Sequence, residues 1–243
     1  MGFRPDEKIH LYASVARAFK APTLKHLYDS APIFNPMSGT YIDISNMDLE
    51  PMVGTNSEVG VKLTEIAGLD ISLSYFYYRI RNEIDFDNAT YSYRNIGRSR
   101  HSGIELSMKR SFLTDFHAGA DLSYNSSVFS DGAFLGNQLN GVPTVNYRLR
   151  AAWQYSTGGT IAIRTEGIAR EYINQENTIR LPDWTVLSLD ASYSVRTVSI
   201  HAAIDNLLDK KYNVSGYFDP MIFESRYYPA AIRTITLSIS SSL

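Results

Sequence analysis

The feature that most constrains this chain is a period of two, repeated in segments that alternate apolar residues with polar or small ones. One case runs through Leu149, Ala151 and Trp153, which alternate with Arg150 and Ala152. A period of two is typical of β-strands whose two faces meet different surroundings. Each segment is about as long as the 9 to 11 residues that a tilted strand needs to cross a bilayer. Ten segments show the pattern, at 8–18, 56–66, 69–82, 98–110, 115–127, 145–156, 160–172, 184–195, 198–207 and 231–241.

The connections between these segments alternate strictly in length. Consecutive antiparallel strands place alternate connections at opposite ends of a sheet, so all the long loops fall at one end. Outer-membrane β-barrels have short periplasmic turns and long external loops. The pattern therefore favours a transmembrane barrel over the alternative, a large soluble barrel or sandwich, whose loops have no reason to segregate. Four connections are short, at 67–68, 111–114, 157–159 and 196–197, and five are long, at 19–55, 83–97, 128–144, 173–183 and 208–230.

Charged residues collect on one parity of the sixth and seventh segments, opposite the apolar parity. Two roles are open for them: a charged path for an anionic ligand, or ion pairs with one another and with protein inside the lumen, since buried charges find partners. The apolar parity, with aromatic residues near the segment ends, is expected to face lipid. The candidates for the lumen side are Arg148, Arg150, Arg164, Glu166 and Arg170.

Composition excludes several other classes of protein. The 243 residues carry a net charge of -2 and no cysteine, which excludes a basic nucleic-acid footprint, disulfides and cysteine-bound zinc. No apolar run approaches the roughly 18 residues of a membrane-spanning helix. Residues 1–8 lack the apolar stretch of a secretory signal. If the protein lies outside the inner membrane, its signal is expected upstream of Met1.

The polar residues form no recognisable catalytic or metal-binding motif. Ser192, Asp190 and His201 are the residue types of a hydrolytic triad, but no nucleophile elbow surrounds the serine. We therefore expect no enzymatic activity, no cofactor and no metal site. The five histidines show no close paired spacing of the kind that binds a metal: His10, His26, His101, His117 and His201.

Several stretches, in order along the chain, are similar to motifs of the TonB-dependent outer-membrane receptors. Residues 204–212 resemble the N-L-F-D-K-x-Y signature near the end of these receptors. Residues 16–28 resemble an F-[RK]-A-P-x-x-x-x-L-Y element, and 46–60 resemble N-P-x-L-x-P-E … E-x-G, with Met47 and Met52 replacing its first proline and its glutamate. Similar to further segments of the family are residues 75–84 (Y-x-x-x-x-x-N-x-I), 95–105 (N-x-G … G-x-E) and 181–190.

The resemblance covers the whole chain, 1–243, and implies an all-β fold: the last ten or so strands of an antiparallel transmembrane β-barrel that in this family has about 22. The family's plug domain, its TonB box and its signal peptide have no counterpart here. The resemblance implies the outer membrane of a Gram-negative bacterium and the uptake of a scarce ligand, an iron–siderophore complex or cobalamin. Outer-membrane lipid, that ligand and TonB, acting through the plug, are the implied partners; nucleic acid is not.

Two loops carry aromatic residues suited to a rigid apolar chelate at a concave mouth. These rings either contact the ligand or only pack the loops that carry them, and the sequence leaves both interpretations open. The identity of a ligand is set by loops, which vary most where function varies. The candidates are Phe34 and Tyr41, in a stretch that also holds Pro32 and Pro36, and Tyr217, Phe218, Tyr227 and Tyr228 in the last long loop.

Two further functions remain open. Ten strands that close on themselves would form a passive pore, and planar-bilayer conductance distinguishes this case because a uniform channel from this chain alone requires a closed barrel. The other is an adhesion barrel, whose loops bind partners without transport. Ligand-independent surface binding would distinguish it from a receptor for uptake.

Overall fold

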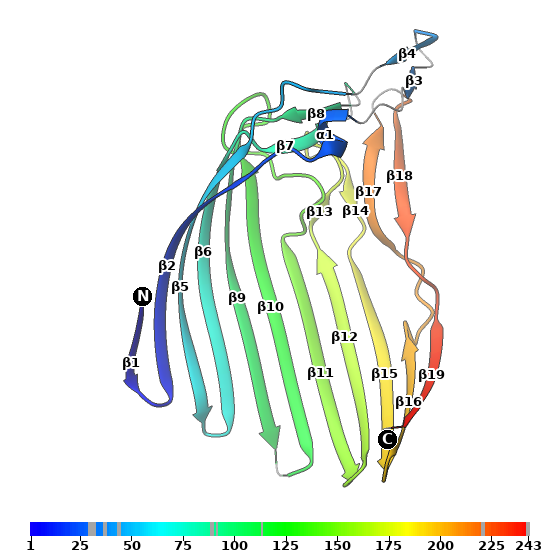
Figure 1. Cartoon of the computed structure of the whole chain (residues 1–243). Helices are drawn as coiled ribbons and strands as arrows, with labels where there is room; N and C mark the ends of the chain where they lie inside the picture. The colour runs from blue at the N-terminus through cyan, green and yellow to red at the C-terminus, as the bar shows by residue number, and fades with distance from the viewer. Residues whose placement is uncertain are drawn as a thin grey trace.

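The computed structural model describes residues 1–28, 33–35, 38–42, 45–87, 90, 92–112, 114–219 and 222–241. Within them, one antiparallel sheet of eleven strands follows the order of the chain. Figure 1 shows it as a tall, curved wall. The predicted fold class, the antiparallel wall of a β-barrel, is confirmed. The strands are β1 (Gly2–Asp6), β2 (Ile9–Lys20), β5 (Met52–Ile66), β6 (Leu69–Arg81), β9 (Arg98–Phe112), β10 (Phe116–Phe129), β11 (Val145–Ser156), β12 (Gly159–Ala169), β15 (Trp184–Val195), β16 (Val198–Asp205) and β19 (Thr234–Ser241).

Ten of these strands coincide with the ten predicted segments, and β1 is additional. The sequence did not predict β1 because Gly2–Asp6 shows no clear alternation and contains Pro5. Proline has no backbone donor and is tolerated on edge strands, which is where β1 lies. Its register with β2 shifts between Phe3 and Asp6, the interval that holds the proline.

The sheet is open. Within the described residues, β1 pairs with β2 alone and β19 pairs with β16 alone. The two ends of the chain lie on opposite sides of the wall in Figure 1. A ten-strand pore requires hydrogen bonds between the first and last strands, and the described sheet has eleven strands without that pairing.

Short turns and long loops lie at opposite ends of this wall, as predicted (Figure 1). The turn between β5 and β6 consists of Ala67 and Gly68, with φ of 53° and 72°, the paired positive angles of a two-residue hairpin turn. No described helix is long and apolar enough to cross a membrane. The long loops contain short elements whose length is too small to show a period: α1 (Leu24–Tyr28), β3 (Ile33–Asn35), β4 (Thr40–Ile42), β7 (Ile84–Asp87), β8 (Ser92–Asn95), β13 (Glu171–Tyr172), β14 (Arg180–Leu181), β17 (Asn213–Asp219) and β18 (Glu224–Pro229).

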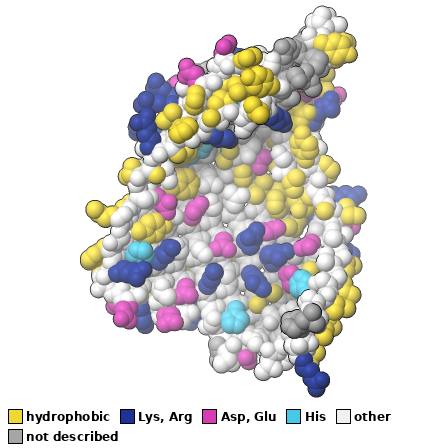
Figure 2. Space-filling view, viewed as in Figure 1, with side chains coloured by type: hydrophobic (Ala, Val, Ile, Leu, Met, Phe, Trp, Pro, Cys, Tyr) yellow, Lys and Arg dark blue, Asp and Glu magenta, His cyan; other side chains and the backbone are white. Residues whose placement is uncertain are grey.

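The register gives the wall two chemically different faces. Residues paired across antiparallel strands point to the same side, and Arg148 is paired with Asp121 on one side and with Glu166 on the other. Figure 2 shows charged side chains scattered over this hollow face. The adjacent Leu149 points to the other, apolar face and is 42% exposed. Exposed apolar residues of that face include Val59, Leu73, Ile104, Leu122, Ile163, Ile200 and Leu237.

Aromatic side chains mark both ends of the apolar face. Near the short turns, Phe116 stacks on Trp153 with ring centroids 5.8 Å apart, and Trp153 meets Tyr155 edge-on at 6.0 Å. Nearer the long loops, Tyr75 and Tyr124 are 46% and 51% exposed on the same face. Two aromatic bands that flank an aliphatic zone are the pattern of strands that cross an outer membrane.

Two of the family-like motifs place a glycine beneath an aromatic ring. A Cβ added to Gly60 would lie 2.5 Å from Cζ of Tyr12, whose hydroxyl donates a hydrogen bond to Glu58 at 2.8 Å. A Cβ added to Gly103 would lie 2.6 Å from Cζ of Phe76. Any larger residue would displace these rings. The glycines of the E-x-G and G-x-E motifs are therefore explained by rings that lie against the backbone on the hollow face.

Candidate functional site

The predicted lumen charges meet on the hollow face of adjacent strands. Arg148 of β11 lies directly opposite Glu166 of β12, and its Nε donates to Glu166 Oε2 at 3.1 Å. Of the two side chains, 61% and 34% is exposed, so the pair contributes no more than about 1 kcal/mol to stability. What the pair adds is a fixed position for two opposite charges on the wall.

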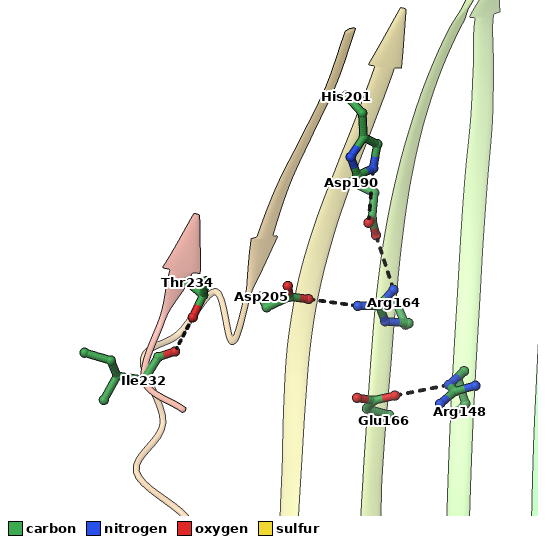
Figure 3. A network of polar contacts seen from close by, with 8 residues as sticks. All are labelled: Arg148, Arg164, Glu166, Asp190, His201, Asp205, Ile232 and Thr234. Carbon is green, nitrogen blue, oxygen red and sulfur yellow. Dashed lines mark hydrogen bonds and ion pairs between the residues drawn. The ribbon is translucent and has the colours of Figure 1, made fainter. Parts of the chain in front are cut away.

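Arg164 is the centre of a second group of charges (Figure 3). Its Nη2 donates to Asp205 Oδ1 at 2.9 Å, and its Nη1 lies 3.7 Å from Asp190 Oδ2. The other oxygen of Asp190 lies 3.9 Å from His201 Nε2. Arg164 therefore links β12 to β15 and β16 through side chains.

Arg150 lies in the same region of the hollow face. Within the described residues it makes no hydrogen bond and no ion pair, although it lies directly opposite Arg164 in the β11–β12 ladder. Asp190 and Asp205 both pair with Arg164, whereas no carboxylate of the described residues lies within ion-pair distance of the Arg150 guanidinium. A cavity of about 600 Å³ opens there, and its lining includes Arg148, Arg150, Arg164, Glu166, Asp190 and His201.

Arg170, the fifth predicted residue, does not join this group. It follows the last residue of β12, with φ of 60°, and its backbone N–H donates to Asp183 Oδ1 at 2.9 Å. Its side chain is exposed at the loop end. Sequence reasoning in turn missed Asp190 and Asp205 as partners of Arg164. The alternation in the sequence places both aspartates on the charged face. Their pairing with Arg164, however, depends on the register of β12, β15 and β16, which the sequence of a single segment does not give.

The residue types of a hydrolytic triad lie near one another without triad geometry. Ser192 and His201 are opposite one another in the β15–β16 ladder, but in the described part of the chain no hydrogen bond joins them. Asp190 is shared with Arg164. A general base must reach the proton of its nucleophile, and this contact is missing here. Among the described residues, no group of three or more metal-binding side chains occurs either.

Three long loops pack around a small apolar core, which we call the loop core and define as residues 129–144, 170–183 and 213–219. Ile173, Leu181 and Phe129 are 0%, 1% and 2% exposed. Asn177 Nδ2 donates to the Gln138 carbonyl at 2.8 Å, and the Gln138 N–H donates back to Asn177 Oδ1 at 2.6 Å. These loops are therefore fixed by packing and by reciprocal amide bonds.

Burial raises the pKa of two carboxyl groups in the loops. Glu171, at the edge of the loop core, is only 4% exposed, and burial raises its pKa above the ordinary value. Burial also raises the pKa of Asp85 in β7, with repulsion from Glu83 and Asp87 adding to the effect. Both groups therefore keep a proton to higher pH than a solvated carboxyl does.

The predicted ligand-contact rings form one pair on each of two hairpins. Phe34 and Tyr41 face each other across β3 and β4, edge-on with centroids 5.4 Å apart, and are 51% and 70% exposed. Tyr217 of β17 and Tyr228 of β18 lie 6.2 Å apart. Among the described residues, no ring contact joins one hairpin to the other.

The remaining residues of that prediction have different positions. The Phe218 backbone N–H donates to the Ile173 carbonyl at 3.1 Å, which makes Phe218 part of the loop core. Tyr227 is 42% exposed on the opposite strand of the hairpin. Pro32 and Pro36 lie outside the described residues.

The signature-like stretch forms a turn that closes on itself. Asn206 is 5% exposed with φ of 52°, an angle that asparagine tolerates better than most residues. Its Oδ1 accepts from the Lys210 N–H at 2.9 Å, and its Nδ2 donates to the Lys210 carbonyl at 2.8 Å. Asp209 Oδ1 accepts from the Arg233 N–H at 2.9 Å. The motif therefore links the end of β16 to the start of β19.

A second polar clamp joins the first two long loops. Asn95 Oδ1 accepts from the Glu50 N–H at 2.8 Å, and its Nδ2 donates to the carbonyls of Glu50 and Asn82 at 3.0 and 2.8 Å. Asn82, with φ of 54°, donates to Glu50 Oε2. The asparagines of two further family-like motifs are thus explained as links between loops.

Known proteins share this architecture. The vitamin B12 transporter BtuB of Vibrio cholerae is 27% identical over 98% of this chain and 36% of its own length. The iron-regulated outer membrane virulence protein of the same species is 23% identical over 84% of this chain and 34% of its own. The siderophore receptor PiuA of Acinetobacter baumannii has the same fold, with a TM-score of 0.75 and 22% identity over 99% of this chain and 34% of that protein.

By name, the first of these proteins is a transporter and the third is a receptor. The chain spans about a third of the length of each, between 34% and 36%. The family described as TonB dependent receptor-like, beta-barrel, matches residues 1–207 of the 243. With its strands, faces and loop ends arranged as described, this chain belongs to that family of outer-membrane β-barrels.

Proposed function

We propose that this chain is part of the wall of an outer-membrane receptor that takes up an iron–siderophore complex or cobalamin with energy delivered by TonB. The observation that supports this most is the polarity of the wall, with an apolar outer face, a charged hollow face and structured loops at one end. The relatives include a vitamin B12 transporter and a ferric-pyoverdine receptor. In this proposal, residues 1–243 form the carboxy-terminal portion of the barrel, and a separate plug domain occupies the hollow side.

The two ring pairs are the proposed ligand contacts. Phe34, Tyr41 and Tyr228 are exposed in loops at the external end, and the half-buried Tyr217 lies beside Tyr228. Aromatic rings supply large contact area at small entropic cost, which suits a rigid chelate. Arg150 has the free charge that an anionic ligand or an acidic plug segment requires.

Uptake in living cells tests the proposal. Cells that produce the protein receive radiolabelled cobalamin or radioiron loaded on a set of siderophores, in strains with and without TonB. We expect one ligand class to accumulate only when TonB is present, while surface binding continues without it. Uptake that is unchanged without TonB would instead indicate a passive pore. Surface attachment to host or bacterial partners without any ligand uptake would indicate an adhesion barrel.

The ring pairs are tested in the same assay. Tyr217→Ala combined with Tyr228→Ala is expected to weaken ligand binding by about tenfold or more, a loss of about 1.4 kcal/mol. Leu135→Ala is the matched control, because Leu135 is 66% exposed in a long loop outside both hairpins. Equal effects of the two changes would show that these rings only pack their loop.

A further inference from the structure

The outer face carries a cluster of arginines that belongs neither to the loops nor to the charged hollow face. The register aligns Arg17 of β2, Thr55 of β5, Arg79 of β6 and Arg100 of β9 in one row across the sheet. The next row towards the loop end, on the same face, contains Arg81 opposite Arg98. Basic side chains gather at the upper left of Figure 2, near the loop end of these strands. We call the five residues Arg17, Arg79, Arg81, Arg98 and Arg100 the arginine patch.

The patch sits at the boundary of the lipid-facing zone. Along the same face of β6, Leu73 and Tyr75 are 40% and 46% exposed, and Tyr77, Arg79 and Arg81 follow at the next alternate positions. The sequence of rows is therefore aliphatic, then aromatic, then cationic towards the external end. Arg79 Nε donates to Tyr77 Oη at 2.8 Å, and its guanidinium carbon lies 5.1 Å from the centroid of that ring. This arrangement places the cations where an outer-leaflet lipid has its polar groups.

Four of the five arginines of the patch have no acidic partner within the described residues, and the exception is Arg98. Arg79 lies directly opposite Arg100, and Arg81 directly opposite Arg98; like charges in such positions destabilise a sheet. Asp131 lies 3.5 Å from Arg98 Nε. Within the described residues, Arg17, Arg81 and Arg100 have no ion pair or hydrogen bond from their side chains. Two surface pockets of about 310 and 290 Å³ lie between these arginines and are open for a ligand.

From this geometry we propose that the arginine patch binds the phosphate groups of a lipid in the outer leaflet of the membrane, whose acyl chains lie along the apolar face below it. Arginine binds phosphate through two parallel hydrogen bonds, and several arginines on a rigid sheet fix its position. A bound phosphate removes the repulsion between the opposed pairs. A soluble anion would gain nothing from the aliphatic and aromatic rows beneath the patch, which is why the occupant is a lipid.

Lipid binding to the protein purified from outer membranes in detergent tests the proposal. The probes are lipid A, a diphosphorylated glycolipid, and the same lipid with its phosphates removed, each titrated into the detergent micelles that hold the protein. We expect the unaltered protein to bind the phosphorylated lipid at least about tenfold more tightly, with a preference that falls as salt screens the charges. Equal binding of the two lipids would overturn the proposal without any variant being needed.

Variants locate the effect. Arg79→Gln, Arg81→Gln and Arg100→Gln together are expected to abolish the preference for phosphate. Arg110→Gln is the matched control, because Arg110 lies on the same face of β9 near its other end, with its guanidinium carbon 4.6 Å from the Phe112 ring centroid. If the triple variant does not fold, Arg100→Gln alone replaces it. A preference that survives in the folded variant would overturn the assignment to the patch.

Competition with inorganic phosphate distinguishes a site for a lipid from a site for a free anion. At constant ionic strength, millimolar inorganic phosphate is expected to leave binding of the phosphorylated lipid unchanged, because the lipid also gains from its acyl chains. Full competition by inorganic phosphate would show a site for the free anion and would overturn the lipid assignment.

Discussion

Strand β11 holds two opposite environments within one residue of each other. Leu149 lies on the apolar outer face with Trp153, whereas Arg150 lies on the hollow face among charges. The backbone hydrogen bonds of both residues belong to the same ladders. Only the side of the sheet differs. The comparison shows that the surroundings of a side chain in this wall depend on the face it points to, and not on its neighbours in the sequence.

The largest expected effect breaks the comparison directly, by exchanging the two chemistries. Leu149→Arg is expected to destabilise folding into a bilayer by about 2–4 kcal/mol, because a cation near the bilayer midplane loses its hydration. Arg150→Leu is expected to change stability little, because Arg150 has no partner to lose. Urea titration of the protein in lipid vesicles, followed by tryptophan fluorescence, measures both. Equal losses of stability would mean that the two faces do not differ in whether lipid or water surrounds them.

A smaller effect is expected from the hollow face alone. Asp190→Asn combined with Asp205→Asn leaves Arg164 without carboxylates and opposite Arg150, and should cost about 1–3 kcal/mol. Adding Arg150→Gln to that background is expected to restore part of the loss by removing the repulsion. The same urea titration provides the values. No recovery on adding Arg150→Gln would show that the two arginines do not interact.

The exposed ion pair provides a finer test of the hollow face. Glu166→Gln removes the partner of Arg148 but keeps the shape, and we expect a loss of no more than about 1 kcal/mol, since exposed pairs contribute little. Thermal unfolding in detergent at low and high salt measures it, and added salt should erase the difference. A loss as large as that of the double variant at Asp190 and Asp205 would mean that this face is dry rather than wetted.

The loop core is a third environment, neither lipid nor charged wall, and its test is a dependence on pH. The folded-state pKa of Glu171 is raised, so its contribution to stability is present below the ordinary pKa of 4.5 and is lost as pH rises through the raised value. Hydrogen exchange at the Ile173 amide, which donates to the Ile179 carbonyl at 3.0 Å, should therefore quicken with rising pH beyond the intrinsic rate. Glu171→Gln should remove this excess. If the excess pH dependence persists in Glu171→Gln, a group other than Glu171 causes it.

Much of the wall was predictable because a period of two indicates the strand, the two faces and the strand length at once. The features that were not predicted are those where this period is absent or ends early. Strand β1 was missed because Pro5 interrupts any alternation. The segment predicted over 160–172 ends as a strand at Ala169, because Arg170 adopts a positive φ, and this moves its side chain out of the lumen group.

The site was less predictable than the wall. The ion pairs of Arg164 depend on how far β12, β15 and β16 are shifted along one another, which is a property of the assembled sheet. The loop core depends on Ile173 and Leu181, which lie in a long connection outside the ten predicted segments. The arginine patch was not expected, because its members are spread over three separate strands and only the register brings them into adjacent rows.

The free edge of β19 determines what this wall joins. Along Thr234–Ser241, the described structure leaves one side of the backbone without a neighbouring strand. In hydrocarbon each unsatisfied N–H or C=O costs several kcal/mol. A membrane-inserted copy therefore acts as a template for any strand of matching alternation. Without a partner strand from its own protein, such a copy is driven towards edge-to-edge association with other copies as its density in the bilayer rises.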